Sequence, residues 1–291
     1  MILAVASGKG GTGKTMVTAA LASVWDGPLV AVDLDVEEPN LHLFLHPQVK
    51  EEESARMDVP VVDEEKCTYC RACSDLCQFK AISVLRDVVL TFPEMCHGCG
   101  GCIRICPEGA LKTGHRELGT VLSGEANGIG FLMGRLKVGE AMSPPLMRVV
   151  KSKLDAMLQN NPKDVLIDAP PGVSCPAVTA VMDCDAVLLV TEPTPFGLYD
   201  LKLAVEAFEK LDKPMGVVIN RAGIGDEGVY TFCQDRNLPI LSEIPYDRQI
   251  AKAYSTGNIA TEISPAHKAV FTDLLTRVKR IGVEKKEPCH A

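Results

Sequence analysis

The stretch "ILAVASGKGGTGKT", residues 2–15, decides the fold. Its apolar start predicts a buried strand, and residues 8–15 match G-x-x-x-x-G-K-T before a helix expected over about 14–25. Glycines here let backbone N–H groups surround phosphate oxygens, and the helix N-terminus adds partial positive charge. The motif therefore predicts a nucleotide-phosphate loop rather than a plain glycine-rich turn. Its residues are Gly8, Lys9, Gly10, Gly11, Thr12, Gly13, Lys14 and Thr15. Lys14 is expected to reach the β- and γ-phosphates, and the Thr15 hydroxyl to bind Mg2+.

Four further apolar runs predict strands of the same sheet. They lie at 28–33, 164–168, 186–190 and 215–220. Strands buried on both faces lose polar alternation, so they read as continuous Val, Ile and Leu. Between the runs lie amphipathic segments such as 197–211, in which apolar residues recur every three or four positions. Strands that alternate with helices predict an α/β fold with a doubly wound, mostly parallel sheet.

Eight of the 12 cysteines follow one spacing, used twice. "CTYCRACSDLC" (67–77) and "CHGCGGCIRIC" (96–106) both read C-x-x-C-x-x-C-x-x-x-C. Three thiolates of such a run wrap one iron–sulfur cubane, and in two-cluster ferredoxins the fourth Cys ligates the other cluster. We therefore predict one 4Fe-4S cluster on Cys67, Cys70, Cys73 and Cys106, and another on Cys96, Cys99, Cys102 and Cys77. A zinc site is the alternative, but it leaves the third and fourth Cys of each run without a role.

The cysteine region is internally repeated and interrupts the α/β rhythm. It is expected to be a small inserted α+β unit of the bacterial ferredoxin type. The predicted organisation is a first part of a P-loop domain at 1–57, the insertion at 58–117, and the second part at 118–291. One departure is that Gln78 follows Cys77, where the bacterial pattern has the proline found at Pro107. The charged tail 283–291 is expected to be frayed.

Composition narrows the functional classes. The net charge of −8 opposes a broad nucleic-acid footprint, which needs clustered cations. No apolar run approaches the roughly 20 residues of a membrane-spanning helix, and the N-terminus has no basic signal-peptide region. Cysteines at cluster spacing in a chain of 291 residues argue against a secreted disulfide framework. The sequence predicts a protein of the reducing cytoplasm, without stable membrane insertion.

Three segments resemble the MinD/ParA superfamily of P-loop ATPases, which includes the nitrogenase iron protein. "GKGGTGKT" has that family's extra lysine, here Lys9, which the resemblance implies reaches across an ATP-bound homodimer to the partner's nucleotide. "VDLDVEEPN" (32–40) resembles its first switch, so Asp35 would orient or deprotonate the attacking water. "DVLIDAPPG" (164–172) resembles its second switch, so Asp168 would hold Mg2+ through a water. The alternatives are a solvated Lys9, and a capping role for Asp35.

Two later positions match residues that contact adenine in these relatives. They are Asn220, which ends a predicted strand, and Pro245 in "IPYD". An asparagine at a strand end is equally typical of a turn. Cys175 follows the second switch, where the nitrogenase iron protein has a cluster ligand, but we favour a small buried hydrophobe there.

The combined pattern is identified as that of MinD-superfamily ATPases with an inserted two-cluster ferredoxin domain. The resemblance implies a slow, partner-stimulated, Mg2+-dependent ATPase in which nucleotide state is coupled to electron transfer or to a redox or regulatory partner. A cluster carrier of the Mrp type is the first alternative, although no late C-x-x-C follows residue 106. A MinD- or ParA-like spatial organiser is the second. Its membrane anchor would be the amphipathic segment 268–282, although an apolar stripe there more often docks on the sheet.

Overall fold

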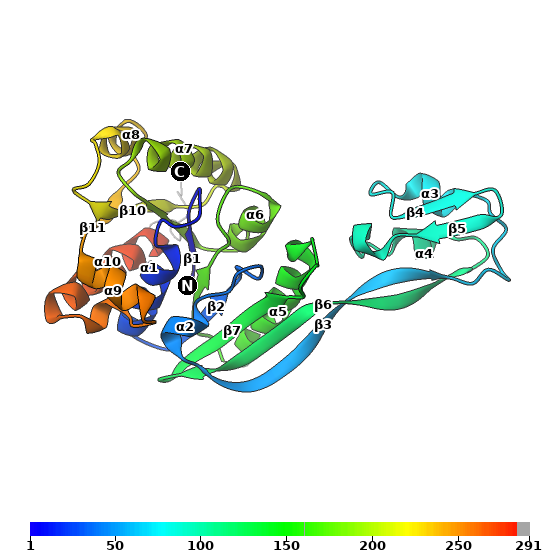
Figure 1. Ribbon diagram of the computed structural model, residues 1–291, viewed down its shortest axis with the longest axis horizontal. Helices are drawn as coiled ribbons and strands as arrows, with labels where there is room; N and C mark the ends of the chain where they lie inside the picture. Colours follow the sequence, from blue (N-terminus) through cyan, green and yellow to red (C-terminus); the bar gives the residue numbers. More distant parts are fainter. Residues whose placement is uncertain (160, 284–291) are drawn as a thin grey trace, which may run out of the picture.

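The computed structural model describes residues 1–159 and 161–283, and its main body is built on a nine-stranded sheet (Figure 1). The strand order is β11-β10-β9-β1-β8-β2-β7-β6-β3. All neighbours from β11 to β7 are parallel, whereas β6 is antiparallel to both β7 and β3. The strands are β1 (Ile2–Ala6), β2 (Leu29–Asp33), β3 (Gln48–Val62), β6 (Leu111–Ala126), β7 (Ile129–Leu136), β8 (Asp164–Asp168), β9 (Ala186–Thr191), β10 (Met215–Ala222) and β11 (Ile240–Pro245).

Helices cover both faces of the sheet and close two separate hydrophobic cores. The fully buried side chains Phe131 and Phe271 belong to one core, and Phe208 belongs to the other. The first face is covered by α1 (Lys14–Val24), α2 (His42–Leu45), α9 (Arg248–Ser255), η3 (Ala260–Glu262) and α10 (Pro265–Val283). The second is covered by α5 (Ser143–Gln159), α6 (Cys175–Val181), α7 (Pro195–Phe208) with η2 (Glu209–Leu211), and α8 (Gly228–Asp235).

This architecture confirms the predicted α/β fold with a mostly parallel sheet. The five strands expected from apolar runs are β1, β2, β8, β9 and β10. The helix expected over 197–211 begins two residues earlier at Pro195, and its last turn, Glu209–Leu211, is a 3-10 helix. Thr194 caps its start, because the hydroxyl accepts a hydrogen bond from the Gly197 N–H at 3.0 Å. No helix within the described ranges is long and apolar enough to cross a bilayer.

The cysteine region sits at the end of a long two-stranded ribbon (Figure 1). β3 and β6 pair from Gln48 with Glu125 to Val62 with Leu111, and their far halves leave the sheet and hold residues 63–110 away from the body. The predicted boundaries at 58 and 117 lie inside this ribbon, since Asp58 pairs with His115 and Glu117 with Arg56. We call residues 63–110 the cysteine module. It contains α3 (Ala72–Leu76), β4 (Ile82–Leu85), β5 (Val88–Thr91), η1 (Pro93–Met95) and α4 (Gly101–Ile105).

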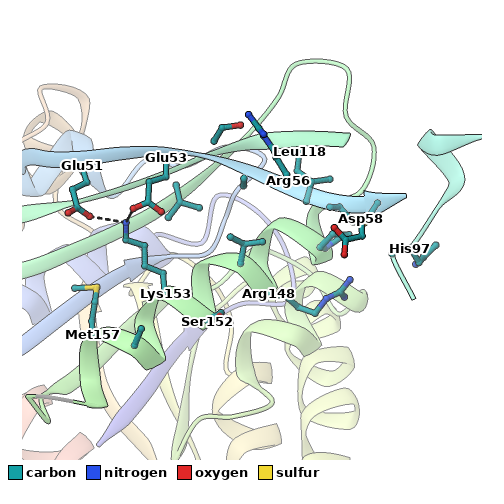
Figure 2. Close-up of a pocket in the computed structure, with 18 residues that line it drawn as sticks. Glu51, Glu53, Arg56, Asp58, His97, Leu118, Arg148, Ser152, Lys153 and Met157 are labelled. Atoms are coloured by element: carbon teal, nitrogen blue, oxygen red, sulfur yellow. Dashed lines mark hydrogen bonds and ion pairs between the residues drawn. The ribbon is translucent and has the colours of Figure 1, made fainter. Parts of the chain in front are cut away.

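A groove of about 830 Å³ lies between the ribbon and α5 (Figure 2). Lys153 on α5 bridges to the ribbon, with its Nζ 2.6 Å from a Glu53 oxygen and 3.1 Å from a Glu51 oxygen. His97 and Gly98 of the cysteine module border the same groove. The ribbon is thus joined to the body by the ion pairs of Lys153, and the groove beside it extends to the cysteine module. The predicted frayed tail falls almost wholly outside the described residues.

Candidate functional site

The phosphate loop joins β1, in the middle of the sheet, to the start of α1. Gly11 and Gly13 have φ angles of +80° and +92°, a conformation that side chains with a Cβ rarely adopt. A Cβ on Gly13 would also lie 2.3 Å from Nδ2 of Asn220, and one on Gly8 would lie 2.0 Å from the carbonyl oxygen of Asp200. Gly11 is therefore required by its backbone conformation, Gly8 by close packing, and Gly13 by both.

The three side chains predicted to handle Mg2+ and phosphate lie together at the start of α1. The Thr15 hydroxyl donates a 2.6 Å hydrogen bond to Asp168, and the Lys14 ammonium lies 3.6 Å from the same carboxylate. Asp168 is only 1% exposed. Thr18, which the sequence analysis did not single out, also donates to Asp168 at 3.2 Å from one helical turn further on. Carboxylate and hydroxyl oxygens suit Mg2+, which binds few protein ligands and keeps several waters.

Two aspartates after β2 have different environments. Asp33 is completely buried, and its carboxylate accepts hydrogen bonds from the backbone N–H groups of Asp35 at 3.0 Å and Leu41 at 2.9 Å. It therefore shapes the loop, as a capping residue does. Burial first, and then the charge of Asp168, raise the pKa of Asp33. Burial raises the pKa of Asp35 to about 6, with Lys14 opposing the rise and Asp168 adding to it. A carboxyl group with that pKa can accept a proton near neutral pH.

Lys9 is held by its own chain. Its Nζ lies 2.6 Å from Oε1 of Glu192, and Nη1 of Arg221 lies 2.8 Å from Oε2 of the same carboxylate. Arg221 also donates through Nη2 to the carbonyl oxygen of Gly11 at 3.3 Å. Burial opposes ionisation of Glu192, but Lys9 and Arg221 outweigh it and lower the pKa. Lys9 is therefore ion-paired, and the reading of a freely solvated lysine does not describe it.

A cavity of about 270 Å³ adjoins the phosphate loop on the side of β10 and β11. Both residues predicted to contact a base, Asn220 and Pro245, line it together with Gly11 and Gly13. The Asn220 amide donates to the Thr12 carbonyl oxygen at 2.8 Å, so it also fixes the loop. The Thr12 hydroxyl is buried and has no hydrogen-bond partner within the described part of the chain, which leaves a polar atom free for a ligand.

The eight predicted cluster cysteines line two separate cavities of the cysteine module. Their grouping follows the crossed pattern predicted from spacing, in which the fourth Cys of each run joins the first three of the other. One cavity is lined by Cys67, Cys70, Cys73 and Cys106. The other is lined by Cys77, Cys96, Cys99 and Cys102.

The sequence repeat is also a repeat of backbone conformation. In and just after the first cysteine run, three residues have a positive φ angle. The three residues at the equivalent positions of the second run have one too. The pairs are Tyr69 and Gly98, Arg71 and Gly100, and Lys80 and Gly109. Backbone N–H groups donate to cysteine sulfurs at matching places, from Ala81 to Cys77 at 3.3 Å and from Ala110 to Cys106 at 3.3 Å. Such N–H···S bonds stabilise thiolates that carry a metal cluster.

The cysteines of each set lie near one another. Burial first, and then neighbouring thiols, raise the pKa of Cys73 and Cys102, so these sulfurs are close to others of their own sets. Among residues 1–159 and 161–283, no three His, Cys, Asp or Glu side chains converge closely enough to hold one metal ion. Four cysteine sulfurs are the ligand set that a 4Fe-4S cubane takes from a protein, and tetrahedral zinc can also take four.

Cys175 lies apart from both cysteine sets. It is exposed at the start of α6 on the main body, so the expected small buried hydrophobe is wrong. Cys175 is the first residue of this short helix, directly before Pro176. Cys184 and Cys233 are buried, and burial raises their pKa to about 12 and about 11. These two therefore behave as core residues.

Fold and phosphate loop together define a P-loop nucleotide-binding protein. The family model described as "CobQ/CobB/MinD/ParA nucleotide binding domain" matches residues 3–260. The chain therefore belongs to this family and is a MinD/ParA-type ATPase by class. An uncharacterized protein of Methanocaldococcus jannaschii is 31% identical over 267 residues, covering 88% of this chain and 90% of that protein.

Two other similarities are to a solved structure and to part of a curated protein. The septum site-determining protein MinD of Pyrococcus horikoshii, solved with Mg-ADP, superposes with a TM-score of 0.59 at 22% identity, covering 98% of each chain. This likeness shows the shared fold. A cytosolic Fe-S cluster assembly factor, the NUBP1 homolog of Caenorhabditis elegans, is 29% identical over 138 residues, which are 40% of this chain and 44% of that one.

Three residues of the site were not found from the sequence. Glu192 had a usable signal, because it directly follows a buried strand, where carboxylates face the ligand crevice of an open sheet. Thr18 lies one turn after Lys14 and could have been found from helical spacing. Arg221 had no such signal: it has a φ of +56° at an irregularity between β10 and β11, which the sequence does not reveal.

Proposed function

We propose that this protein is a Mg2+-dependent ATPase that carries two 4Fe-4S clusters and couples its nucleotide state to electron transfer or to a redox-dependent partner. One observation carries the proposal: two cavities, each lined by a crossed set of four cysteines, in a chain that also has a P-loop site. The family membership supports the nucleotide half. The partial similarity to a cluster assembly factor supports an iron–sulfur role.

In the nucleotide half, each residue has a task of its own. Lys14 would neutralise the β- and γ-phosphates, while Thr15 and Asp168 would hold Mg2+. Asp35, with a pKa of about 6, would take the proton of the attacking water. Asn220 and Pro245 would bound the base. Lys9 would act across an ATP-dependent homodimer, as the family resemblance implies.

In the cysteine module, each crossed set would hold one cluster. When bound, a cluster supplies one-electron chemistry at a potential set by charge, hydrogen bonds to sulfur and solvent exposure. This chain contributes the N–H donors of Ala81, Gly98 and Ala110 to cysteine sulfurs. These donors stabilise extra negative charge on the sulfurs, so they favour the reduced state.

Coupling between the halves has a continuous path through the backbone. The Leu34 N–H donates to the Asp168 carbonyl at 2.9 Å, and the Leu136 N–H at the end of β7 donates to the Val36 carbonyl at 2.8 Å. β7 pairs with β6, which runs with β3 into the cysteine module. The segment that carries Asp35 is thus fastened to Asp168 on one side and to the ribbon's sheet on the other. Movement of this segment on ATP binding would be transmitted to the module.

Anaerobic isolation with iron and sulfide analysis and EPR, with and without Mg-ATP, tests this function. The expected result is iron and sulfide in equal amounts, and a cluster reduction potential, followed by EPR, that shifts when Mg-ATP is added. The variant Cys99→Ser should lower the iron content, and Cys175→Ser, outside both cavities, is the matched control. The coupling would be ruled out if the reduction potentials were the same with and without ATP and the rate of ATP hydrolysis were the same with oxidised and reduced clusters.

A cluster carrier is the second candidate, favoured by the similarity to the NUBP1 homolog. In that case the loaded protein should pass its cluster to an apo-acceptor, whereas clusters fixed by four protein ligands each should stay. Incubation with an apo-ferredoxin, followed by its absorption spectrum, separates the two functions.

A further inference from the structure

The Glu192 carboxylate lies between two cations at the edge of the phosphate loop. Lys9 contacts one oxygen at 2.6 Å and Arg221 contacts the other at 2.8 Å. Glu192 is only 7% exposed, whereas the Lys9 side chain is 29% exposed and lies nearer the solvent. The proposed function needs Lys9 in a partner's site, yet in this single chain Lys9 is turned inward.

The backbone of Glu192 is fixed in place. It directly follows β9, which pairs with β1 at Ala6, just before the phosphate loop. Its carbonyl oxygen accepts a hydrogen bond from the Thr194 N–H at 2.8 Å. The backbone of Gly197 packs so closely on that oxygen that a Cβ there would lie 2.1 Å from it. Lys9 must therefore leave Glu192 before it can reach another chain.

Departure of a lysine from a buried carboxylate normally leaves an uncompensated charge, which is strongly unfavourable. Here Arg221 stays on the other oxygen. Its guanidinium is also anchored to the Gly11 carbonyl oxygen at 3.3 Å, and its backbone N–H is fixed by the Asn220 side-chain oxygen at 2.9 Å. The Glu192 carboxylate remains paired and hydrogen-bonded after Lys9 has left, so the free-energy cost of releasing Lys9 is small.

We propose that Glu192 is a positioning residue that holds Lys9 in its own chain until an ATP-bound dimer forms, and that Arg221 permits the release by keeping the carboxylate paired. This inference rests on the proposed ATP-dependent homodimer. It assigns the two residues opposite effects on dimerisation, although both lie on one ion-pair network.

The test measures the dimer dissociation constant by analytical ultracentrifugation at saturating Mg2+ and a slowly hydrolysed ATP analogue. Glu192→Gln frees Lys9 in both protomers. At about tenfold per protomer, the size of one charge-assisted hydrogen bond, the dissociation constant of the symmetric dimer should fall by about a hundredfold. Arg221→Ala leaves Lys9 as the only partner of Glu192, so the dimer should weaken by a similar factor. In Glu192→Gln/Arg221→Ala that weakening should disappear.

Two controls separate this role from a structural one. In a Lys9→Ala background, Glu192→Gln should no longer tighten the dimer. A thermal melt shows which variants are folded, and only those are compared. If wild type dimerises but folded Glu192→Gln dimerises equally or less, the inference is overturned and the proposed function stands. If wild type stays monomeric with the analogue, the proposed homodimer fails, and this inference fails with it.

Discussion

Replacement of Asp168 by alanine tests the geometry of the phosphate site in the absence of any ligand. The change removes the acceptor of the Thr15 and Thr18 hydroxyls, at 2.6 and 3.2 Å, and the carboxylate 3.6 Å from the Lys14 ammonium. The Lys14 side chain is only 8% exposed, so its charge is left without this partner in a poorly solvated place. Asp168→Ala is therefore expected to lower the free energy of unfolding substantially.

The magnitude follows from two opposing effects. Removal of one partner from a buried ion pair costs about 3–5 kcal/mol. Asp168 also raises the pKa of Asp33 and Asp35, so its loss relieves repulsion between carboxylates and offsets part of that cost. The expected net loss is about 2–4 kcal/mol at neutral pH.

Urea denaturation of the anaerobically prepared protein without nucleotide measures this loss. Asp183→Ala is the matched control, because Asp183 lies 2.9 Å from Lys151 but its side chain is 71% exposed. That shorter but solvated ion pair should contribute only about 0–1 kcal/mol. Equal losses for Asp168→Ala and Asp183→Ala would refute the reasoning, because burial rather than distance is what distinguishes them.

Two further predictions concern Asp35 and the crossed cysteines. The pKa of Asp35 in the folded protein is about 6, above its ordinary value of 3.8. The protonated side chain therefore contributes fully to the free energy of unfolding below pH 4, and this contribution is lost as pH rises through 6. Asp35→Asn should therefore be more stable than wild type by about 2–3 kcal/mol at pH 8 and equal near pH 4, with ATP hydrolysis abolished. If Asp35→Asn and wild type were equally stable from pH 4 to pH 8, the raised pKa of Asp35 and the burial that causes it would be contradicted. Cys106→Ser should remove the cluster of the first run and leave that of the second, as judged by EPR and iron content; loss of the second cluster alone would mean that the sets are not crossed.

The predictable parts of the fold are those buried on both faces. β1, β2, β8, β9 and β10 appear as continuous apolar runs because helices cover the sheet on each side. β3 and β6 were missed for the opposite reason: along much of the ribbon, residues such as Glu52 and Arg56 are exposed. Within β3 only residues 55–59 alternate between buried and exposed, whereas residues 48–54 are all exposed, so most of the strand lacks the apolar alternation that would reveal it. The boundaries predicted at 58 and 117 therefore lie within the ribbon.

The site divides in a similar way. Glycine positions and Thr15 follow from local spacing, because one loop positions all their atoms. The grouping of the cysteines around two cavities joins three cysteines of one run to one of the other, as the repeated spacing predicted. The Lys9–Glu192–Arg221 network joins residues more than 180 positions apart through the neighbouring strands β1, β9 and β10. Only the strand order brings these side chains together, and the sequence does not state that order. The residues of the phosphate loop were thus predictable, whereas the ion pairs that restrain Lys9 were not.

The most direct test of the central claim is an EPR-monitored redox titration of the anaerobically isolated protein, with and without Mg-ATP. Two 4Fe-4S clusters require about eight irons and eight sulfides per chain. The account predicts that content, together with a midpoint potential that shifts when Mg-ATP binds. Zinc or no metal at the eight cysteines, or potentials that stay the same with and without nucleotide, would contradict it.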